Sequence, residues 1–189
     1  MWNQLRKIAD KKPWEFTYEE MIGKNPPVDE WARNWNEDEF WYSKPSQEDT
    51  TVSEIIHESP EWHNLYNIGL AKYQYAVAKD KEYSRWLLLV RTIKKDGEIV
   101  DDWSPVGEYR SGDMGIALTY RGEGAGTAFV KKLMELGAWH PSIGYSPEGL
   151  KSAQKAYKKI VDEAIERKER IPESVRQWHS DESYKEYGI

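Results

Sequence analysis

Apolar side chains recur at helical spacing in three stretches of the chain. The first predicted helix begins at the start signal Ser59-Pro60-Glu61 and runs to about residue 79. The second covers residues 127–137, where Gly137 suits a C-cap. The third covers residues 147–170, with Ser146 as its N-cap and Pro147 in its first turn. The pattern therefore predicts three helices in the rear two thirds of the chain.

Between residues 84 and 118, helical periodicity ends and residues that favour β-strands become frequent. Residues 86–90 form an apolar run that continues through Thr92 and Ile93 as a β-favouring stretch, and Asp96-Gly97 predicts a hairpin turn into a second strand over 98–103. After breaks at Ser104-Pro105 and Ser111-Gly112, residues 114–118 predict a third, short strand. A sheet is therefore expected in the middle of the chain.

The front of the chain predicts short helices. Thr17 with Glu20 and Thr51 with Glu54 have the spacing of capping boxes, and Pro27 suits the first position of a helix that runs to about residue 41. The whole order is helices, hairpin, strand, glycine-rich turn, helix, a short extended piece over 141–145, and helix. This order predicts a mixed α/β or α+β arrangement.

Three regions follow from this reading. Residues 1–58 are expected to be an acidic, tryptophan-rich, mostly helical extension, residues 59–170 the core, and residues 171–189 a polar tail. Trp178 and Tyr184 are the candidate anchors of that tail. One hydrophobic core is expected at 189 residues.

Charge is distributed unevenly along the chain. The net charge is −6, and residues 1–62 hold 7 basic against 14 acidic side chains, whereas the rest holds 20 against 19. An acidic surface repels phosphate backbones, so nucleic-acid binding is not expected. The acidic part is nevertheless rich in tryptophan, which indicates that it folds on its own core or on a partner; these residues are Trp2, Trp14, Trp31, Trp35 and Trp41.

Several kinds of site are excluded by residue type. The chain has no cysteine, so it has no disulfide, no thiolate zinc site and no cysteine nucleophile, and a reducing compartment is favoured. No apolar run approaches the roughly 20 residues that cross a bilayer, so we expect a soluble cytoplasmic protein without membrane contact. The histidines lack ligand spacing, so no metal site is expected; they are His57, His63, His140 and His179.

The candidate chemistry lies in a glycine-rich turn between the third strand and the helix over 127–137. Gly122, Gly124 and Gly126 let an anion approach the backbone, and the helix adds its positive dipole end. The turn lacks the Gly-Lys-Ser/Thr ending of a P-loop, and its glycine spacing differs from that of the dinucleotide fingerprint. An ordinary tight connection is the other interpretation.

Residues 121–126, Arg-Gly-Glu-Gly-Ala-Gly, resemble the acetyl-CoA loop of the GNAT superfamily of N-acyltransferases, whose pattern is Arg/Gln-x-x-Gly-x-Gly/Ala. Tyr120 before it is also usual in that family. The resemblance extends over residues 85–159 in the order of elements, and it implies a GNAT-like mixed sheet. The compact size and the atypical ends of the chain are those expected of a divergent, phage-encoded member.

The resemblance also implies a set of site residues. Acetyl-CoA would be the cosubstrate, with no metal, and its pantetheine arm would pair with Ile116, Ala117 and Leu118. Its diphosphate would bind at the turn and helix start, formed by Arg121, Gly122, Glu123, Gly124, Ala125, Gly126 and Thr127.

Proton transfer in such an enzyme needs an acid and a base. The sequence Ala153-Gln154-Lys155-Ala156-Tyr157 matches the family's Ala-x-x-x-Tyr element, in which Tyr157 protonates the departing thiolate; a packed helix aromatic is the alternative. Glu108 and Asp113 are the candidate bases, with solvated loop carboxylates as the alternative.

The chain departs from the family at its end. Leu150 replaces the usual Asn of the last helix, Val161-Asp162 replace Gly-Phe, and residues 171–189 contain no convincing strand pair. The acceptor side must therefore be built from the acidic front of the chain, or be absent.

Two functions follow. The first is an N-acetyltransferase that moves an acetyl group from acetyl-CoA to an amine, on a small molecule or a protein, by direct attack. The second is a non-catalytic interaction protein, such as a component of a virus particle, that docks on a protein partner through its N-terminal region; the docking residues would be Trp31, Trp35, Phe40 and Trp41.

Overall fold

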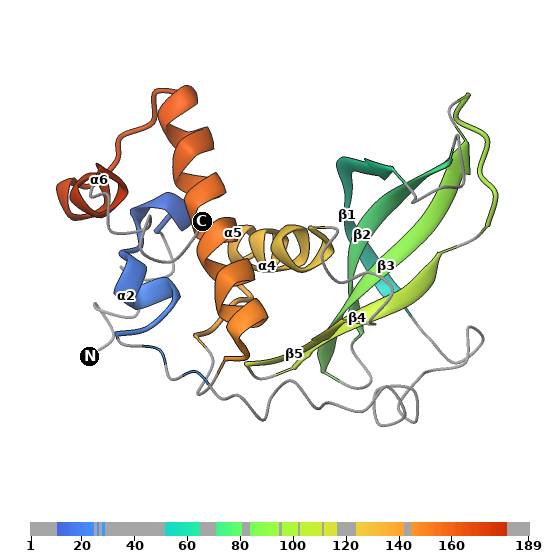
Figure 1. The fold of residues 1–189 in the computed structure, drawn as a ribbon, viewed down its shortest axis with the longest axis horizontal. Coiled ribbons are helices and arrows are strands. Elements are labelled where there is room, and N and C mark those ends of the chain that lie inside the picture. Colours follow the sequence, from blue (N-terminus) through green and yellow to red (C-terminus); the bar gives the residue numbers. More distant parts are fainter. Residues whose placement is uncertain are drawn as a thin grey trace. The chain divides into compact units, whose positions relative to one another are not determined.

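The computed structural model shows a mixed α+β protein (Figure 1). It divides into two compact units, Met1–Trp31 with Val130–Ile189, and Ala32–Phe129. We call them the helical unit and the sheet unit. Side chains are not described for residues 52–64, 71 and 72, and the structure describes residues 11–24, 26, 28, 52–64, 71–80, 84–94, 96–101, 103–110, 112–116, 124–141 and 145–180.

The sheet unit contains a five-stranded antiparallel meander. Its strands follow one another in space in the same order as in the chain, each antiparallel to the next. They are β1 (Val52–Asn64), β2 (Ala71–Asp80), β3 (Arg85–Lys94), β4 (Ser104–Arg110) and β5 (Asp113–Ile116).

The predicted helix over residues 60–79 is wrong, because this part of the chain forms β1 and β2. Side chains 74–78 of β2 are all buried, so both faces of this strand are covered and no alternation of polar and apolar residues marks it. Pro60 is tolerated because β1 is an outer strand and its pairing shifts between Ser59 and His63.

The front of the chain also differs from its prediction. The Thr51–Glu54 capping box is wrong, since β1 begins at Val52, and the predicted boundary at residue 58 falls inside this strand. The capping box of Thr17 and Glu20 is confirmed at the short helix α2 (Tyr18–Met21). Of the predicted helix over 27–41, only Val28 is described, and it forms a β-bridge with Tyr145 rather than part of a helix. Trp2, Trp31, Trp35, Phe40 and Trp41 lie outside the described residues.

The central sheet follows the sequence more closely. The strand over 86–93 is confirmed as β3, and the turn at Asp96-Gly97 is confirmed by the hydrogen bond from the Gly97 N–H to the Lys94 carbonyl. The expected strand over 98–103 is reduced to one bridge between Ile93 and Ile99. The expected break at Ser104-Pro105 is instead the start of β4, where Pro105 lies at a bulge opposite β3.

Three helices follow the sheet, namely α4 (Ala125–Glu135), α5 (Pro147–Glu166) and α6 (Glu173–Ser180). The first two confirm the prediction, with Gly137 in the left-handed region after α4 and the Ser146 hydroxyl accepting the Gly149 N–H at the start of α5. α5 ends at Glu166 rather than near residue 170, and α6 lies in the expected tail.

Side-chain donors from the rear of the chain hold residues 16–22 in the helical unit. The Trp139 indole N–H donates to the Met21 carbonyl at 2.8 Å, and the Tyr145 hydroxyl donates to the Ile22 carbonyl at 3.2 Å. The Gln154 amide donates to the Tyr18 hydroxyl at 2.8 Å. These bonds satisfy polar groups that packing removes from water.

Helix α6 packs on the same segment. The Trp178 ring stacks on Tyr18 with 5.0 Å between ring centroids, which confirms Trp178 as an anchor, while Tyr184 lies outside the described residues. Ile171 and Val175 are buried. The tail is therefore part of the helical unit as far as residue 180.

None of the helices in the described ranges combines the length and the hydropathy that a membrane span requires.

Candidate functional site

The predicted acyl-CoA segment runs from β5 into α4. Gly124 has φ +85°, in the left-handed region that favours glycine, and its carbonyl accepts the Ala128 N–H in the first turn of α4. Residues 117, 118 and 120–123 lie outside the described residues, so the predicted contacts of Ala117, Leu118, Arg121, Gly122 and Glu123 stay predictions.

The start of α4 is the described part of the predicted diphosphate site. Ala125 and Thr127 are buried, and Gly126 is half-buried. The first N–H groups of a helix have no partner within it, and the helix dipole is positive at this end. An anion would therefore be stabilised by the backbone here.

Glu108 is the candidate base that lies on β4, next to β5 at the start of the predicted acyl-CoA segment. It lies on β4 directly opposite Gly115 of β5, and the next pair in the register joins Gly107 to Ile116. Ile116 is the first residue predicted to hold the pantetheine arm. The Glu108 carboxylate is therefore on the strand beside the predicted acyl-CoA strand, with 18% of its side chain exposed.

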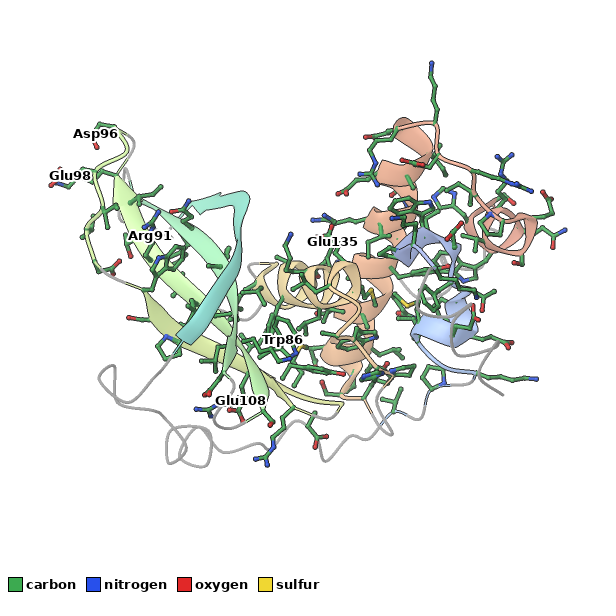
Figure 2. All side chains as sticks on the ribbon, turned by 180° about the vertical axis from the view of Figure 1, so that it is seen from behind. Trp86, Arg91, Asp96, Glu98, Glu108 and Glu135 are labelled. Atoms are coloured by element: carbon green, nitrogen blue, oxygen red, sulfur yellow. The ribbon has the colours of Figure 1, made fainter. Side chains whose placement is uncertain are left out.

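A buried arginine holds this carboxylate. The Arg85 guanidinium donates from Nη1 to Glu108 Oε2 at 2.8 Å and from Nε to Asp80 Oδ2 at 3.0 Å. The three side chains come from β4, β3 and β2, and Asp80 and Arg85 are almost completely buried. Figure 2 shows Glu108 at the end of the sheet away from the hairpin tip that carries Asp96 and Glu98.

Sequence reasoning missed Arg85 and Asp80. They flank the β2–β3 turn and pair in register, and Glu108 lies 23 positions after Arg85. The one available signal was a pair of opposite charges at the ends of two strongly apolar strands, where unpaired charges are costly.

Asp113, the other candidate base, lies at the start of β5 opposite Arg110 and is exposed. This is the environment of a solvated turn carboxylate. Glu108 is therefore the stronger of the two candidates, because its partial burial and fixed partner give it one defined position.

Tyr157 is packed in the helical unit rather than presented to a substrate. Its side chain is fully buried, its hydroxyl donates to the Phe16 carbonyl at 2.6 Å, and its ring lies 4.8 Å from that of Trp178. Burial, with the charge of Glu20, raises the pKa of Tyr157 well above its ordinary value. This is the packed helix aromatic of the alternative interpretation, and the geometry gives no support to a proton donor.

We expect Tyr157→Phe to lower the free energy of unfolding by about 1–2 kcal/mol, because the partly buried Phe16 carbonyl loses its donor. Urea denaturation of the full chain measures this. Tyr145→Phe is the matched variant, since its hydroxyl makes a longer bond to a backbone carbonyl, and a smaller loss is expected. A Tyr157→Phe protein as stable as the wild type would contradict the structural role.

One histidine pairs with a carboxylate in the described structure. His140 is exposed, and His179 Nε2 lies 2.6 Å from Asp162 Oδ1. Burial opposes the ionised form of Asp162, but hydrogen bonds from Lys158 and His179 outweigh it and hold the pKa of Asp162 below its ordinary value. His57 and His63 lie on β1, and the described residues contain no group of three metal-type ligands.

The chain matches no known family model, and no curated protein or solved structure is significantly similar to it. The candidate site therefore rests on the geometry of this chain, that is, on β4, β5, the start of α4 and the Arg85 ion pairs.

Proposed function

We propose that this chain is an acyl-CoA-dependent N-acyltransferase of GNAT type that transfers an acetyl group from acetyl-CoA to an amine. One observation carries the proposal. A partly buried carboxylate, Glu108, lies opposite Gly115 on β5, and β5 is the strand that precedes the glycine-rich segment and α4. A base beside the strand that holds the thioester is the arrangement that this reaction requires.

The cosubstrate would occupy two described parts of the sheet unit. Gly124 and the first amides of α4 would bind the diphosphate, since a Cβ at Gly124 is disfavoured by its φ and an anion suits the helix start. The pantetheine arm would run along β5, which is the outermost strand of the described sheet on that side.

Glu108 would remove a proton from the acceptor ammonium. The amine nitrogen then attacks the thioester carbonyl carbon, the C–N bond forms, and the C–S bond breaks. The remaining amine proton ends on the CoA sulfur, and the proton on Glu108 returns to solvent. Arg85 would act as a positioning residue, because it fixes one carboxylate oxygen.

The charges of the site favour a cationic acceptor. Among the described residues, two carboxylates, Asp80 and Glu108, share the Arg85 guanidinium, so these three side chains together carry an excess of negative charge. A primary amine that arrives as an ammonium ion is attracted to such a cluster. The acceptor class is therefore a protonated amine on a small molecule or a protein.

Calorimetry with acetyl-CoA tests the proposal. We expect saturable binding to the wild type and a loss of at least about a hundredfold in affinity for Gly124→Glu, whose side chain and charge oppose the diphosphate. Gly137→Glu is the matched control, because Gly137 also has positive φ (+65°) but follows the opposite end of α4, and a Cβ there meets no atom within 4 Å.

Two results would overturn the proposal. One is a folded wild type that does not bind acetyl-CoA, and the other is equal binding by Gly124→Glu and the wild type. Either result would favour the non-catalytic interpretation, in which the tryptophan-rich N-terminal region docks on a partner; those tryptophans lie largely outside the described residues.

A further inference from the structure

The last residues of β3 continue into a hairpin whose tip is exposed. Its limbs are residues 92–94 and 98–101, joined by the turn at Asp96-Gly97, and we call this segment the hairpin arm. Its described residues from 96 to 101 are all exposed, and Ile99 and Val100 are 52% and 54% exposed. Consecutive residues of an extended limb point to opposite faces, so both faces of the outer limb are open to solvent.

The outer limb also presents an open strand edge. The Lys94 N–H donates to the Glu98 carbonyl, and the Val100 N–H donates to the Thr92 carbonyl. In this pattern, the bridged residue between them, Ile99, points its own N–H and C=O away from β3. Within the described part of the chain, no hydrogen bond reaches either group of Ile99, so one donor and one acceptor face outward together.

Contacts within the chain define the shape of the hairpin arm. Gly97 takes φ +90° at the turn, and the Asp101 carboxylate accepts hydrogen bonds from the Thr92 N–H and hydroxyl, which fixes the end of the outer limb. An ion pair between Lys94 and Glu98 joins the two limbs. The arm would therefore lose little conformational freedom when a partner strand binds to its edge.

The base of the hairpin arm is anchored to the sheet. The Arg91 guanidinium lies 4.4 Å from the ring centroid of Trp103 and donates to the Gln74 side chain. Trp103 packs on a buried cluster formed by Ala76, Ala78, Leu87 and Leu89. Figure 2 shows Arg91 nearer to the sheet, and Asp96 and Glu98 at the tip.

The charges of the hairpin arm select its partner. The sequence of the hairpin arm carries three carboxylates, of Asp96, Glu98 and Asp101, against the two ammonium groups of Lys94 and Lys95, so its net charge is −1. Charges on an exposed edge discourage pairing with an identical edge, because the carboxylates would repel one another. A segment that carries basic side chains gains from the same charges.

We propose that the outer limb of the hairpin arm is a docking edge, which binds an extended segment of a partner protein by strand addition. The partner segment alternates basic with aliphatic residues. One of its residues exchanges both backbone hydrogen bonds with Ile99, its aliphatic side chains contact Ile99 and Val100, and its basic side chains pair with the carboxylates. This surface is separate from the proposed acyl-CoA site.

The test uses the full chain and a fluorescent, acetylated heptapeptide that alternates lysine with valine. We expect saturable binding by fluorescence anisotropy, and a shift of the Ile99 amide signal in NMR spectra. Ile99→Pro removes the outward N–H, which the arm does not use, and should weaken binding at least about tenfold. Ile99→Thr is the matched control, because it retains the N–H and a branched side chain, and should weaken binding less than about threefold.

Several results would overturn the docking edge. These are failure of the lysine peptide to bind, equal binding of a peptide that alternates glutamate with valine, and unchanged affinity of Ile99→Pro. A dimer of the wild type in sedimentation that Ile99→Pro abolishes would also overturn the proposal, since the edge would then pair with a second copy. Protection of the Val100 amide in Ile99→Pro confirms that the arm remains folded in these comparisons.

Discussion

Replacing Arg85 by methionine is expected to lower the free energy of unfolding by about 3–5 kcal/mol. Methionine retains much of the length of the arginine stem but removes the guanidinium that holds Asp80 and Glu108. The side chains of Asp80 and Arg85 are only 2% and 6% exposed, so water cannot replace the lost charge. Urea denaturation of the full chain, followed by circular dichroism, measures the difference.

The ion pair of the hairpin arm supplies the control. Lys94→Met breaks a pair whose side chains are 51% and 60% exposed, and no measurable change in stability is expected, because solvent screens such pairs. Arg85→Lys retains the charge but not the planar fork that reaches two carboxylates, so its loss should be intermediate. Equal stability of Arg85→Met and Lys94→Met would show that the buried ion pairs contribute little.

Gly107→Val is expected to destabilise the sheet unit by about 1–3 kcal/mol, although valine favours strands. A Cβ at this position would lie 3.1 Å from the Gly115 carbonyl oxygen and 3.2 Å from Leu88 Cβ and Ile116 Cγ1. The oxygen and the Leu88 Cβ belong to the strands themselves and cannot rotate away. β5 would therefore shift from β4, and acetyl-CoA affinity should fall with stability. Denaturation and calorimetry on one preparation measure both.

Gly97→Ala separates steric crowding from backbone strain. A Cβ at Gly97 meets no atom within 4 Å, but the residue has φ +90°, so alanine there costs about 1 kcal/mol through conformation. Its acetyl-CoA affinity should equal that of the wild type. A Gly107→Val protein with wild-type stability and affinity would contradict the tight contact between β4 and β5.

Local signals in the sequence predicted local structure. Ser146 with Pro147 placed the start of α5, Gly137 placed the end of α4, and Thr17 with Glu20 placed α2. Each of these signals acts within one turn of helix, so no knowledge of the rest of the chain is needed.

Predictions that depended on distant packing were less accurate. The apolar spacing around Tyr73 and Ala76 is compatible with a helix, and what makes this stretch a strand is its pairing with β1 and β3. Pro60 and Pro105, which indicated a helix start and a break, lie instead at an irregular outer strand and at a bulge. Both positions depend on the sheet, which the local sequence does not describe.

The candidate site was predictable only where it depends on local sequence. The positive φ of Gly124 is a local feature that the glycine-rich segment led us to expect, whereas α4 begins at Ala125, two residues before the predicted Thr127, and includes Gly126. The Arg85 ion pairs depend on the register of three strands, and the environment of Tyr157 depends on a contact with Phe16, 141 positions away. A short stretch of sequence gives no information on contacts between residues so far apart in the chain.

The contact between Phe16 and Tyr157 also has a consequence during synthesis. At about 5–20 residues per second, a ribosome needs about 7–28 s to add the 141 residues that separate them. The β-strands are complete well before α5 emerges. Until α5 and α6 are synthesised, the apolar side chains of Phe16, Tyr18 and Met21 lack the helices on which they pack. This segment is thus the first candidate for a chaperone on the nascent chain, and it acquires its native contacts late.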